Sequence, residues 1–329
     1  MKKCYLIIGS NSFSGSNFIN YILSKNVRVV GVSRSRELNK VYLPYKENKF
    51  IENFNFFKVD LNYDNSRLLK IIKKFKPSYI VNFSAQGMVA ESWKHPIDWY
   101  QTNLISQIRL HDQIRKFKFI KKYIQFTTPE VYGSFVNKKK ESFFFEPSTP
   151  YAASRAACDL HLKTFFKAYN FPVIFTRTAN VYGPGQQLYR ITPKSIMFAK
   201  LKKKISLDGG GNSIRSFIYI DDVSRALSML LKKGKVGYTY HISTNKFVSV
   251  KKLVNNIFRK MKISKKNIKD VNDRLGKDHS YKLSSDLIRK EINWKAKINL
   301  NEGLKRTINW VNQNFNTLKN HKTKYIHKK

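Results

Sequence analysis

The chain has 329 residues, enough for one large α/β domain with a smaller domain appended to it. Lysine and arginine (63) exceed aspartate and glutamate (21), giving a net charge of +42, but the lysines are spread along the whole length. We interpret this as a composition bias, which disfavours a nucleic-acid surface. The two cysteines offer neither a disulfide framework nor the spacing of metal ligands. The sequence has no signal-peptide pattern, and no apolar run approaches the ~20 residues of a membrane span. We therefore expect a cytoplasmic protein without metal.

The first predicted elements form a site for phosphate groups. Residues 4–8 are an apolar, β-rich run, residues 9–15 break into a glycine turn, and residues 17–23 have the pattern of an amphipathic helix. A strand, a tight turn and a helix place backbone N–H groups against a pyrophosphate. The candidate cofactor residues here are Gly9, Ser12, Phe13 and Gly15. Ser12 stands where the usual pattern has glycine, which a serine tolerates if its φ stays negative.

The second predicted strand, residues 27–32, leads into Arg34 and Arg36. Sites that prefer NAD carry an acidic residue at this place for the ribose 2′-hydroxyl, whereas arginine suits a 2′-phosphate. The pattern therefore favours NADP modestly over NAD, the alternative being two solvated arginines. A third predicted strand, residues 56–61, ends in Asp60 and Leu61, which we place beside the adenine; an aspartate here is also a common turn former.

Further apolar strands alternate with helical segments, at residues 79–83, 123–127 and 173–176. This rhythm is typical of a doubly wound parallel sheet, and we predict a Rossmann-type α/β fold with a smaller C-terminal α/β substrate domain. The expected cofactor domain covers residues 1–178, with 216–235 packing back on it, and a substrate domain covers 179–317. Residues 318–329 are expected to be a disordered basic tail. The active site should lie in the cleft between the two domains.

Four polar residues form the candidate catalytic group. Thr128 and Glu130 follow the strand at residues 123–127, and Tyr151 and Arg155 stand four apart at the start of a predicted helix. Residues at i and i+4 share a helix face, so the phenol and the guanidinium can point at one ligand. A phenol beside a cation can ionise well below its free pKa of about 10 and act as a base. Alone, such a pair is common on surface helices.

In its ordered motifs the chain resembles the extended short-chain dehydrogenase/reductases, within the NAD(P)-dependent epimerase/dehydratase family, and specifically nucleotide-sugar 4,6-dehydratases of the dTDP-glucose and GDP-mannose type. The resemblance runs from Lys3 to about Asn312. Its motifs are the turn at residues 9–15, residues 82–86, 102–103, 128–133, Tyr151 with its helix, and residues 177–185, 209–222 and 273–281.

The resemblance implies a role for each matching residue. Tyr151 would take the proton of the C4 hydroxyl while a hydride passes from C4 to the nicotinamide, and Thr128 would hydrogen-bond that oxygen. Glu130 would remove the C5 proton, water would leave from C6 and the hydride would return to C6, giving a 4-keto-6-deoxy sugar. Ser84, Ala85, Gln86, Asn103, Tyr151 and Arg155 would also contact the cofactor. Gln86, Asn180, Arg215 and Arg274 would hold the nucleotide-diphosphate sugar.

Two departures from the family pattern bear on activity. Arg155 replaces the usual lysine, which keeps a positive charge but cannot copy the ribose contacts of lysine. Pro129 stands where thymidine-sugar dehydratases have an acid for the departing hydroxyl, whereas the guanosine-sugar branch manages with a glutamate at the next position. Glu130 would then serve as both base and acid.

Competing interpretations remain at this point. A nucleotide-sugar 4-epimerase has no use for Glu130, and a nucleotide-glucuronate decarboxylase shares the threonine, glutamate and tyrosine. A catalytically degenerate, basic nucleotide- or RNA-binding relative is the non-enzymatic alternative.

The family also assembles as homodimers through a four-helix interface. The corresponding helices here are residues 104–115 and 151–168, whose apolar stripes could equally face their own sheet.

Overall fold

A seven-stranded parallel sheet forms the centre of the molecule in the computed structural model, which describes residues 3–273, 275–276 and 278–328. Its strand order is β11-β6-β5-β4-β1-β2-β3, and every neighbouring pair is parallel. The strands are β1 (Cys4–Ile8), β2 (Arg28–Ser33), β3 (Phe54–Lys58), β4 (Tyr79–Asn82), β5 (Lys122–Thr127), β6 (Val173–Thr178) and β11 (Thr239–Ile242). The predicted doubly wound fold is confirmed.

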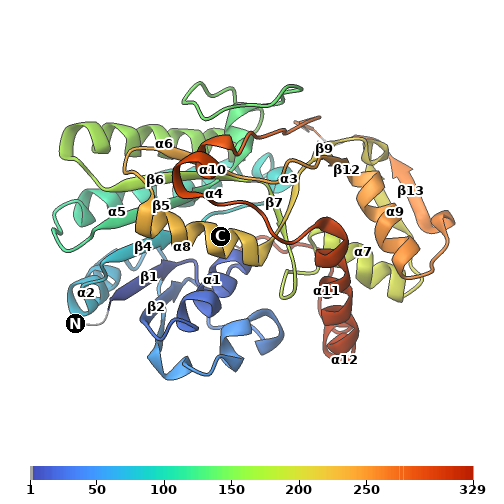
Figure 1. Cartoon of the computed structure of the whole chain (residues 1–329), viewed down its shortest axis with the longest axis horizontal. Coiled ribbons are helices and arrows are strands. Elements are labelled where there is room, and N and C mark those ends of the chain that lie inside the picture. Colours follow the sequence, from blue (N-terminus) through green and yellow to red (C-terminus); the bar gives the residue numbers. More distant parts are fainter. Residues whose placement is uncertain (1–2, 274, 277, 329) are drawn as a thin grey trace.

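Helices cover both faces of this sheet (Figure 1). Apolar side chains of α1 (Phe13–Leu23) and α8 (Ile220–Lys233) share one buried cluster. Those of α2 (Asn65–Phe75), α5 (Ser106–Ile114) and α6 (Pro150–Tyr169) share the other. Because both faces are covered, the central strands read as continuous apolar runs, as in β1, where every residue is buried.

The chain winds outward from β1 in two directions, towards β3 on one side and towards β11 on the other. The reversal lies between β1 and β4, and ligands of such sheets bind at the carboxyl ends of the strands beside this point. The expected cofactor site therefore lies where β1, β2 and β4 end.

After β6 the chain leaves the sheet and returns to it. Helix α8 contacts α1, within the segment 216–235 that we expected to pack back, and β11 then adds an edge strand beside β6. Strand β11 was not foreseen, because Thr239 and His241 interrupt its hydrophobic pattern, although both are buried.

The smaller part of the molecule gathers on the right of Figure 1, around short two-stranded sheets. Its strand pairs are β7 (Asn180–Tyr182) with β10 (Phe217–Tyr219), β8 (Ile205–Asp208) with β13 (Ile268–Val271), and β9 (Ile214–Arg215) with β12 (Val248–Ser249). Its helices are α7 (Ile191–Lys200), α9 (Val250–Lys260), α11 (Leu300–Gln313) and α12 (Phe315–Leu318), while α10 (Asp286–Ile292) contacts β11 and α8.

Short helical elements connect these larger pieces. They are η1 (Lys40–Tyr42), η2 (Pro44–Glu47), η3 (Ile51–Asn53), α3 (Val89–Ser92), α4 (Pro96–Tyr100), η4 (Gln101–Ile105), η5 (Pro129–Tyr132), η6 (Gly209–Gly211) and η7 (Lys265–Asn267). Among the described residues, no helix has the length and apolar character that crossing a membrane requires.

Candidate active site

The geometry of the turn between β1 and α1 requires glycine at two positions. Gly9 has φ +82°, and a Cβ atom there would lie 2.8 Å from the backbone nitrogen of Ser84. A Cβ at Gly15 would overlap the carbonyl oxygen of Gly9. Ser12 has φ −70° and caps α1, its hydroxyl accepting a hydrogen bond from the Gly15 N–H at 3.0 Å. The prediction that serine fits here is confirmed, and α1 begins at Phe13, earlier than the predicted residue 17.

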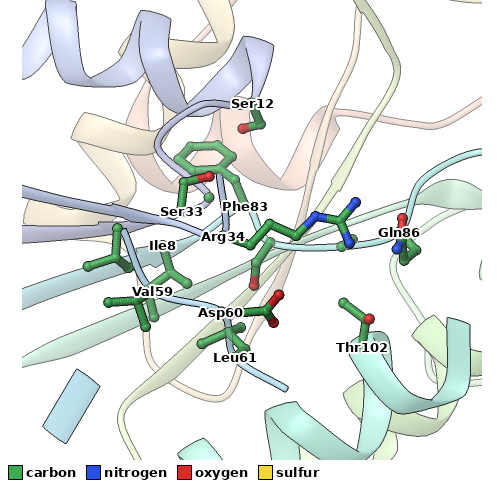
Figure 2. A pocket seen from close by; sticks show the side chains of 14 residues that line it. Ile8, Ser12, Ser33, Arg34, Val59, Asp60, Leu61, Phe83, Gln86 and Thr102 are labelled. Atoms are coloured by element: carbon green, nitrogen blue, oxygen red, sulfur yellow. The ribbon is translucent and has the colours of Figure 1, made fainter. Parts of the chain in front are cut away.

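A cavity opens beside this turn, at the carboxyl ends of the central strands (Figure 2). It brings together many of the predicted cofactor residues, from four separate stretches of the chain. Its lining residues are Ile8, Gly9, Ser12, Val32, Ser33, Arg34, Val59, Asp60, Leu61, Phe83, Ser84, Ala85, Gln86 and Thr102. Six lining residues were not predicted to contact the cofactor: Thr102 and the strand-end residues Ile8, Val32, Ser33, Val59 and Phe83. Apolar strand ends have the same sequence pattern whether or not they border a ligand.

Other predicted cofactor residues lie outside this lining. Phe13 is buried in the core cluster of α1, and Gly15 supports the turn from within the helix. Arg36 is exposed, and its carbonyl oxygen accepts a hydrogen bond from the Asn11 side chain at 2.9 Å. These three residues shape the turn and its flank.

Asn103 lies behind the loop that follows β4. Its side-chain oxygen accepts from the backbone N–H of Gln86 at 2.8 Å, and its amide donates to the Gln86 carbonyl at 3.1 Å and to Ser154 at 3.0 Å. This buried amide thus ties the Gln86 loop to α6 and positions one wall of the cavity.

Arg34 reaches across the mouth of the cavity towards Gln86 (Figure 2). The nearest acidic residue along the chain, Glu37, is held by the Tyr45 hydroxyl at 2.8 Å and by Lys46 at 2.7 Å. Asp60 lines the cavity and also accepts from the Asn62 N–H at 2.9 Å, so it is both a wall residue and a turn former. The cavity therefore presents a cation at the end of β2.

Thr128, Glu130 and Tyr151 come together beyond β5. Thr128 caps the short helix η5, and its hydroxyl accepts from the Glu130 N–H at 3.2 Å. Tyr151 lies in the first turn of α6, which Thr149 caps by accepting from the Ala152 N–H at 3.1 Å. Tyr151 and Thr128 share a side-chain hydrogen bond, and the Glu130 carboxylate is close enough to act electrostatically on the Tyr151 phenol.

The pKa of Tyr151 is raised above its ordinary value. Burial is the largest cause, and the negative charge of Glu130 adds to it. The charge of Arg155, the hydrogen bond with Thr128 and the charge of Arg190 oppose this rise. The prediction that a neighbouring cation lowers the phenol pKa is right in the direction of the Arg155 contribution but wrong in the net result, because burial outweighs it.

Arg155 is almost fully buried, with 1% of its surface exposed. Its guanidinium donates to the carbonyl of Phe126 at 2.6 Å and to that of Ser84 at 3.3 Å. It therefore joins the ends of β4 and β5 beneath the site, in addition to lowering the pKa of Tyr151. The planar fork of arginine suits this double contact better than a lysine would.

Arg190 is a candidate site residue that the sequence analysis missed. It precedes α7, and its charge lowers the pKa of Tyr151. A Cβ on Gly87 would lie 3.5 Å from the Arg190 guanidinium, which places this cation beside the Gln86 loop. Its position five residues beyond the motif at 177–185 was the available signal, but the abundance of basic residues hid it.

The predicted substrate residues lie in different settings. Arg215 packs its guanidinium 4.1 Å from the centre of the Tyr281 ring and donates to the carbonyl of Asp278 at 2.6 Å. Burial is the largest cause of the raised pKa of Tyr281, and the charge of Glu130 adds to it, which places that ring near the Glu130 carboxylate. Asn180 is exposed at the start of β7, and Arg274 lies outside the described residues.

The chain matches a family model described as GDP-mannose 4,6 dehydratase over residues 6–307. The chain belongs to the GDP-mannose 4,6 dehydratase family. It is 32% identical to the human dTDP-D-glucose 4,6-dehydratase over 277 residues, covering 82% of this chain and 78% of the human protein. It is 27% identical to a probable dTDP-glucose 4,6-dehydratase of Sinorhizobium fredii, covering 94% and 93%.

Solved structures of family members agree with this membership. A dTDP-glucose 4,6-dehydratase from Bacillus anthracis in complex with NAD superposes with a TM-score of 0.85 at 30% identity, covering 95% of this chain and 98% of that one. The Streptomyces venezuelae enzyme DesIV, with NAD and TYD bound, superposes with a TM-score of 0.89 at 25% identity, covering 95% and 98%. As a dehydratase of this family, the chain is a nucleotide-sugar 4,6-dehydratase, an enzyme that uses NAD(P), as its motifs predicted.

Proposed function

We propose that Thr128, Glu130 and Tyr151 convert a nucleoside-diphosphate hexose into its 4-keto-6-deoxy product. The observation that carries this proposal is the grouping of the three residues: the Tyr151 phenol shares a hydrogen bond with Thr128 and feels the charge of the Glu130 carboxylate. Tyr151 and Thr128 would act on the C4 oxygen of a sugar and Glu130 on its C5 and C6 groups, so their proximity is what the reaction needs.

The cavity residues fit a dinucleotide. Gly9 and Gly15 allow the tight turn, because a Cβ at either would meet backbone atoms, and the first N–H groups of α1 follow this turn, where a pyrophosphate would bind. The wall made by Asp60 and Leu61 would hold the adenine end, and the Ser84–Gln86 loop would run beneath the rest. Bound NAD(P) would accept a hydride from C4 of the sugar and return it to C6.

The side chains of this chain would move the protons. Tyr151 takes the proton of the C4 hydroxyl, and Thr128 holds the same oxygen through its own hydroxyl. The resulting 4-ketone acidifies the C5–H bond, and Glu130 removes that proton. Glu130 then gives a proton to the departing C6 hydroxyl, which leaves as water, because Pro129 has no acid to offer. When the hydride returns to C6, a solvent proton taken up through Glu130 is added at C5, and this balances the proton that Tyr151 releases. The overall reaction loses one water with no net oxidation.

Alternatives from related chemistry are weaker on the same geometry. A 4-epimerase needs Tyr151 but gives Glu130 no task, whereas here Glu130 acts directly on the phenol. A glucuronate decarboxylase shares all three residues, so only the substrate separates it from a dehydratase. A binding protein without activity would leave the grouping of Tyr151, Thr128 and Glu130 without a purpose.

We also propose a preference for NADP, since Arg34 enters the cavity while Glu37 is engaged elsewhere. The solved relatives contain NAD, so the preference of this chain is tested by titrating the cofactor-free protein with NAD and with NADP. An Arg34→Ala variant should lose the preference if the guanidinium binds a 2′-phosphate.

A cytoplasmic location is proposed as well, supported by the buried free thiols of Cys4 and Cys158.

A two-fold dimer through α5 and α6 completes the proposal. Leu160 on α6 and Ile105 in η4, immediately before α5, are large apolar residues that stay 45% and 39% exposed, while Leu110 and Leu162 on the same helices face the core. An apolar surface of this kind suits a second copy of the chain.

The test of the proposed activity is a panel of nucleotide sugars differing in base and hexose, incubated with enzyme and cofactor. Mass spectrometry should find one substrate that loses a single water to give a 4-keto-6-deoxy product. Loss of carbon dioxide from a uronic acid, or epimerisation without change of mass, would replace the dehydratase with one of its rivals.

A further inference from the structure

The C-terminal segment crosses the molecule as an extended strap. Its residues alternate in burial: His321, Thr323, Tyr325 and His327 are partly buried, while Lys322, Lys324, Ile326 and Lys328 are exposed. A period of two is the pattern of an extended chain lying on a surface. The sequence analysis treated 318–329 as a disordered tail, whereas the structure places its described residues against the body of the protein, with the C-terminal end near the middle of Figure 1.

Side chains on the inward face of the strap make specific contacts. His321 hydrogen-bonds the Tyr42 hydroxyl at 2.8 Å. The Tyr325 hydroxyl donates to Gln86 at 3.3 Å, and its ring packs edge-on against Tyr189 with the ring centres 5.3 Å apart. These contacts anchor the strap from η1 to the Gln86 loop.

His327 is the best-packed residue of the strap. Its ring stacks on His95 at 4.7 Å and on Trp99 at 5.1 Å between ring centres, and its Nε2 is 2.7 Å from the carboxylate of Asp98. Ligand atoms of His95, Asp98 and His327 lie within 4.8 Å of one another. However, the two imidazole planes are only 7° apart, so their in-plane lone pairs run side by side instead of meeting at one ion. The contacts of His327 with His95, Trp99 and Asp98 therefore hold the strap in place.

The end of the strap occupies donors of the cofactor cavity. The Lys328 carbonyl accepts from the Gln86 amide at 2.8 Å and from the Arg34 guanidinium at 3.1 Å. Arg34 and Gln86 both line the cavity, and the Arg34 guanidinium points towards Gln86 in Figure 2. A dinucleotide that binds the same Arg34 and Gln86 donors must therefore displace the Lys328 carbonyl.

We propose that residues 321–328 form an autoinhibitory strap that closes the mouth of the dinucleotide cavity and competes with the cofactor for Arg34 and Gln86. This rests on the proposed binding of NAD(P) in that cavity. The closed form does not bind the cofactor, so the apparent dissociation constant equals the intrinsic constant divided by the fraction of molecules that are open.

The experiment compares cofactor dissociation constants of the full chain with those of a chain lacking residues 323–329, by titration calorimetry. If the strap is closed in nine molecules of ten, its removal tightens binding about tenfold. The truncation also removes lysines that attract an anionic cofactor, so tightening would occur against the change in charge. Unfolding curves of both proteins establish that the body is intact.

Matched point variants separate the inward and outward faces of the strap. Tyr325→Ala with His327→Ala should reproduce the tightening, whereas Lys324→Ala with Ile326→Ala should leave the dissociation constant near that of the full chain. Equal affinity of the full chain, the truncation and the inward variant would overturn the strap while leaving the cofactor site intact. No dinucleotide binding by any form would overturn the proposed function, and the strap with it.

Discussion

The pKa of Tyr151, the proposed base, is set by opposing influences. Burial and Glu130 raise its pKa, while Arg155, Thr128 and Arg190 lower it. The motifs in the sequence identified Glu130, Arg155 and Thr128, because residue types and spacing are visible there, but not Arg190. The net direction could not be predicted, because it depends on how much water the folded site excludes.

Replacing Arg155 with methionine should make catalysis demand a higher pH. The cation lowers the Tyr151 pKa, so its loss raises that pKa and moves the half-maximal rate to higher pH. The measurement is the pH dependence of the rate of sugar oxidation at C4. Arg155→Lys keeps the charge and should restore a profile near that of the wild type. Identical profiles for the methionine variant and the wild type would show that Arg155 only joins the strand ends.

The helix that carries Tyr151 is held to the sheet by a buried ion pair. Asp159 on α6 lies 2.8 Å from Arg177 on β6, and both side chains are 0% exposed. At the level of elements, the apolar runs predicted the first six strands of the sheet. Patterns of polarity could not predict the buried ion pair between α6 and β6, because charged residues are usually expected on the surface. They could not predict β11 either, because its buried residues include polar ones.

Arg177→Met should destabilise the fold by about 3–5 kcal/mol, because it leaves the Asp159 carboxylate buried without its partner. Urea unfolding measures this loss. A matched control is Arg306→Met, which breaks the exposed pair with Glu302 and should cost no more than about 1 kcal/mol. Adding Asp159→Leu to Arg177→Met should recover part of the stability. A loss no larger than that of the control would contradict the importance of this pair.

At the scale of the whole molecule, the return of the chain from the smaller part to β11 brings His241 into the core. Its Nε2 is 2.9 Å from the Tyr132 hydroxyl and its Nδ1 is 2.9 Å from the Ser284 carbonyl. Burial, followed by the charge of Arg177, lowers the pKa of His241 to about 3. Such long-range packing, like the course of the C-terminal strap, depends on contacts between residues far apart in sequence, so local patterns did not predict it.

The stability of the protein should therefore fall in acid. Between the ordinary histidine pKa of about 6.5 and about 3, the unfolded chain binds a proton that folded His241 does not. This contribution is full above about pH 6.5 and declines as the pH falls towards 3. His241→Asn should flatten the dependence of the urea midpoint on pH, although buried His111 keeps part of it. The exposed His279→Asn is the control, and an unchanged slope in His241→Asn would refute this cause.

Reaction in deuterium oxide tests the role of Glu130 most directly. If Glu130 exchanges the C5 proton during elimination, the wild-type product should carry one deuterium at C5. Glu130→Gln should form product at least about 10²-fold more slowly and leave the sugar unlabelled at C5, while Glu146→Gln, an exposed carboxylate on the neighbouring loop, should behave as the wild type. A Glu130→Gln enzyme that made the C5-deuterated product at the wild-type rate would contradict the assignment.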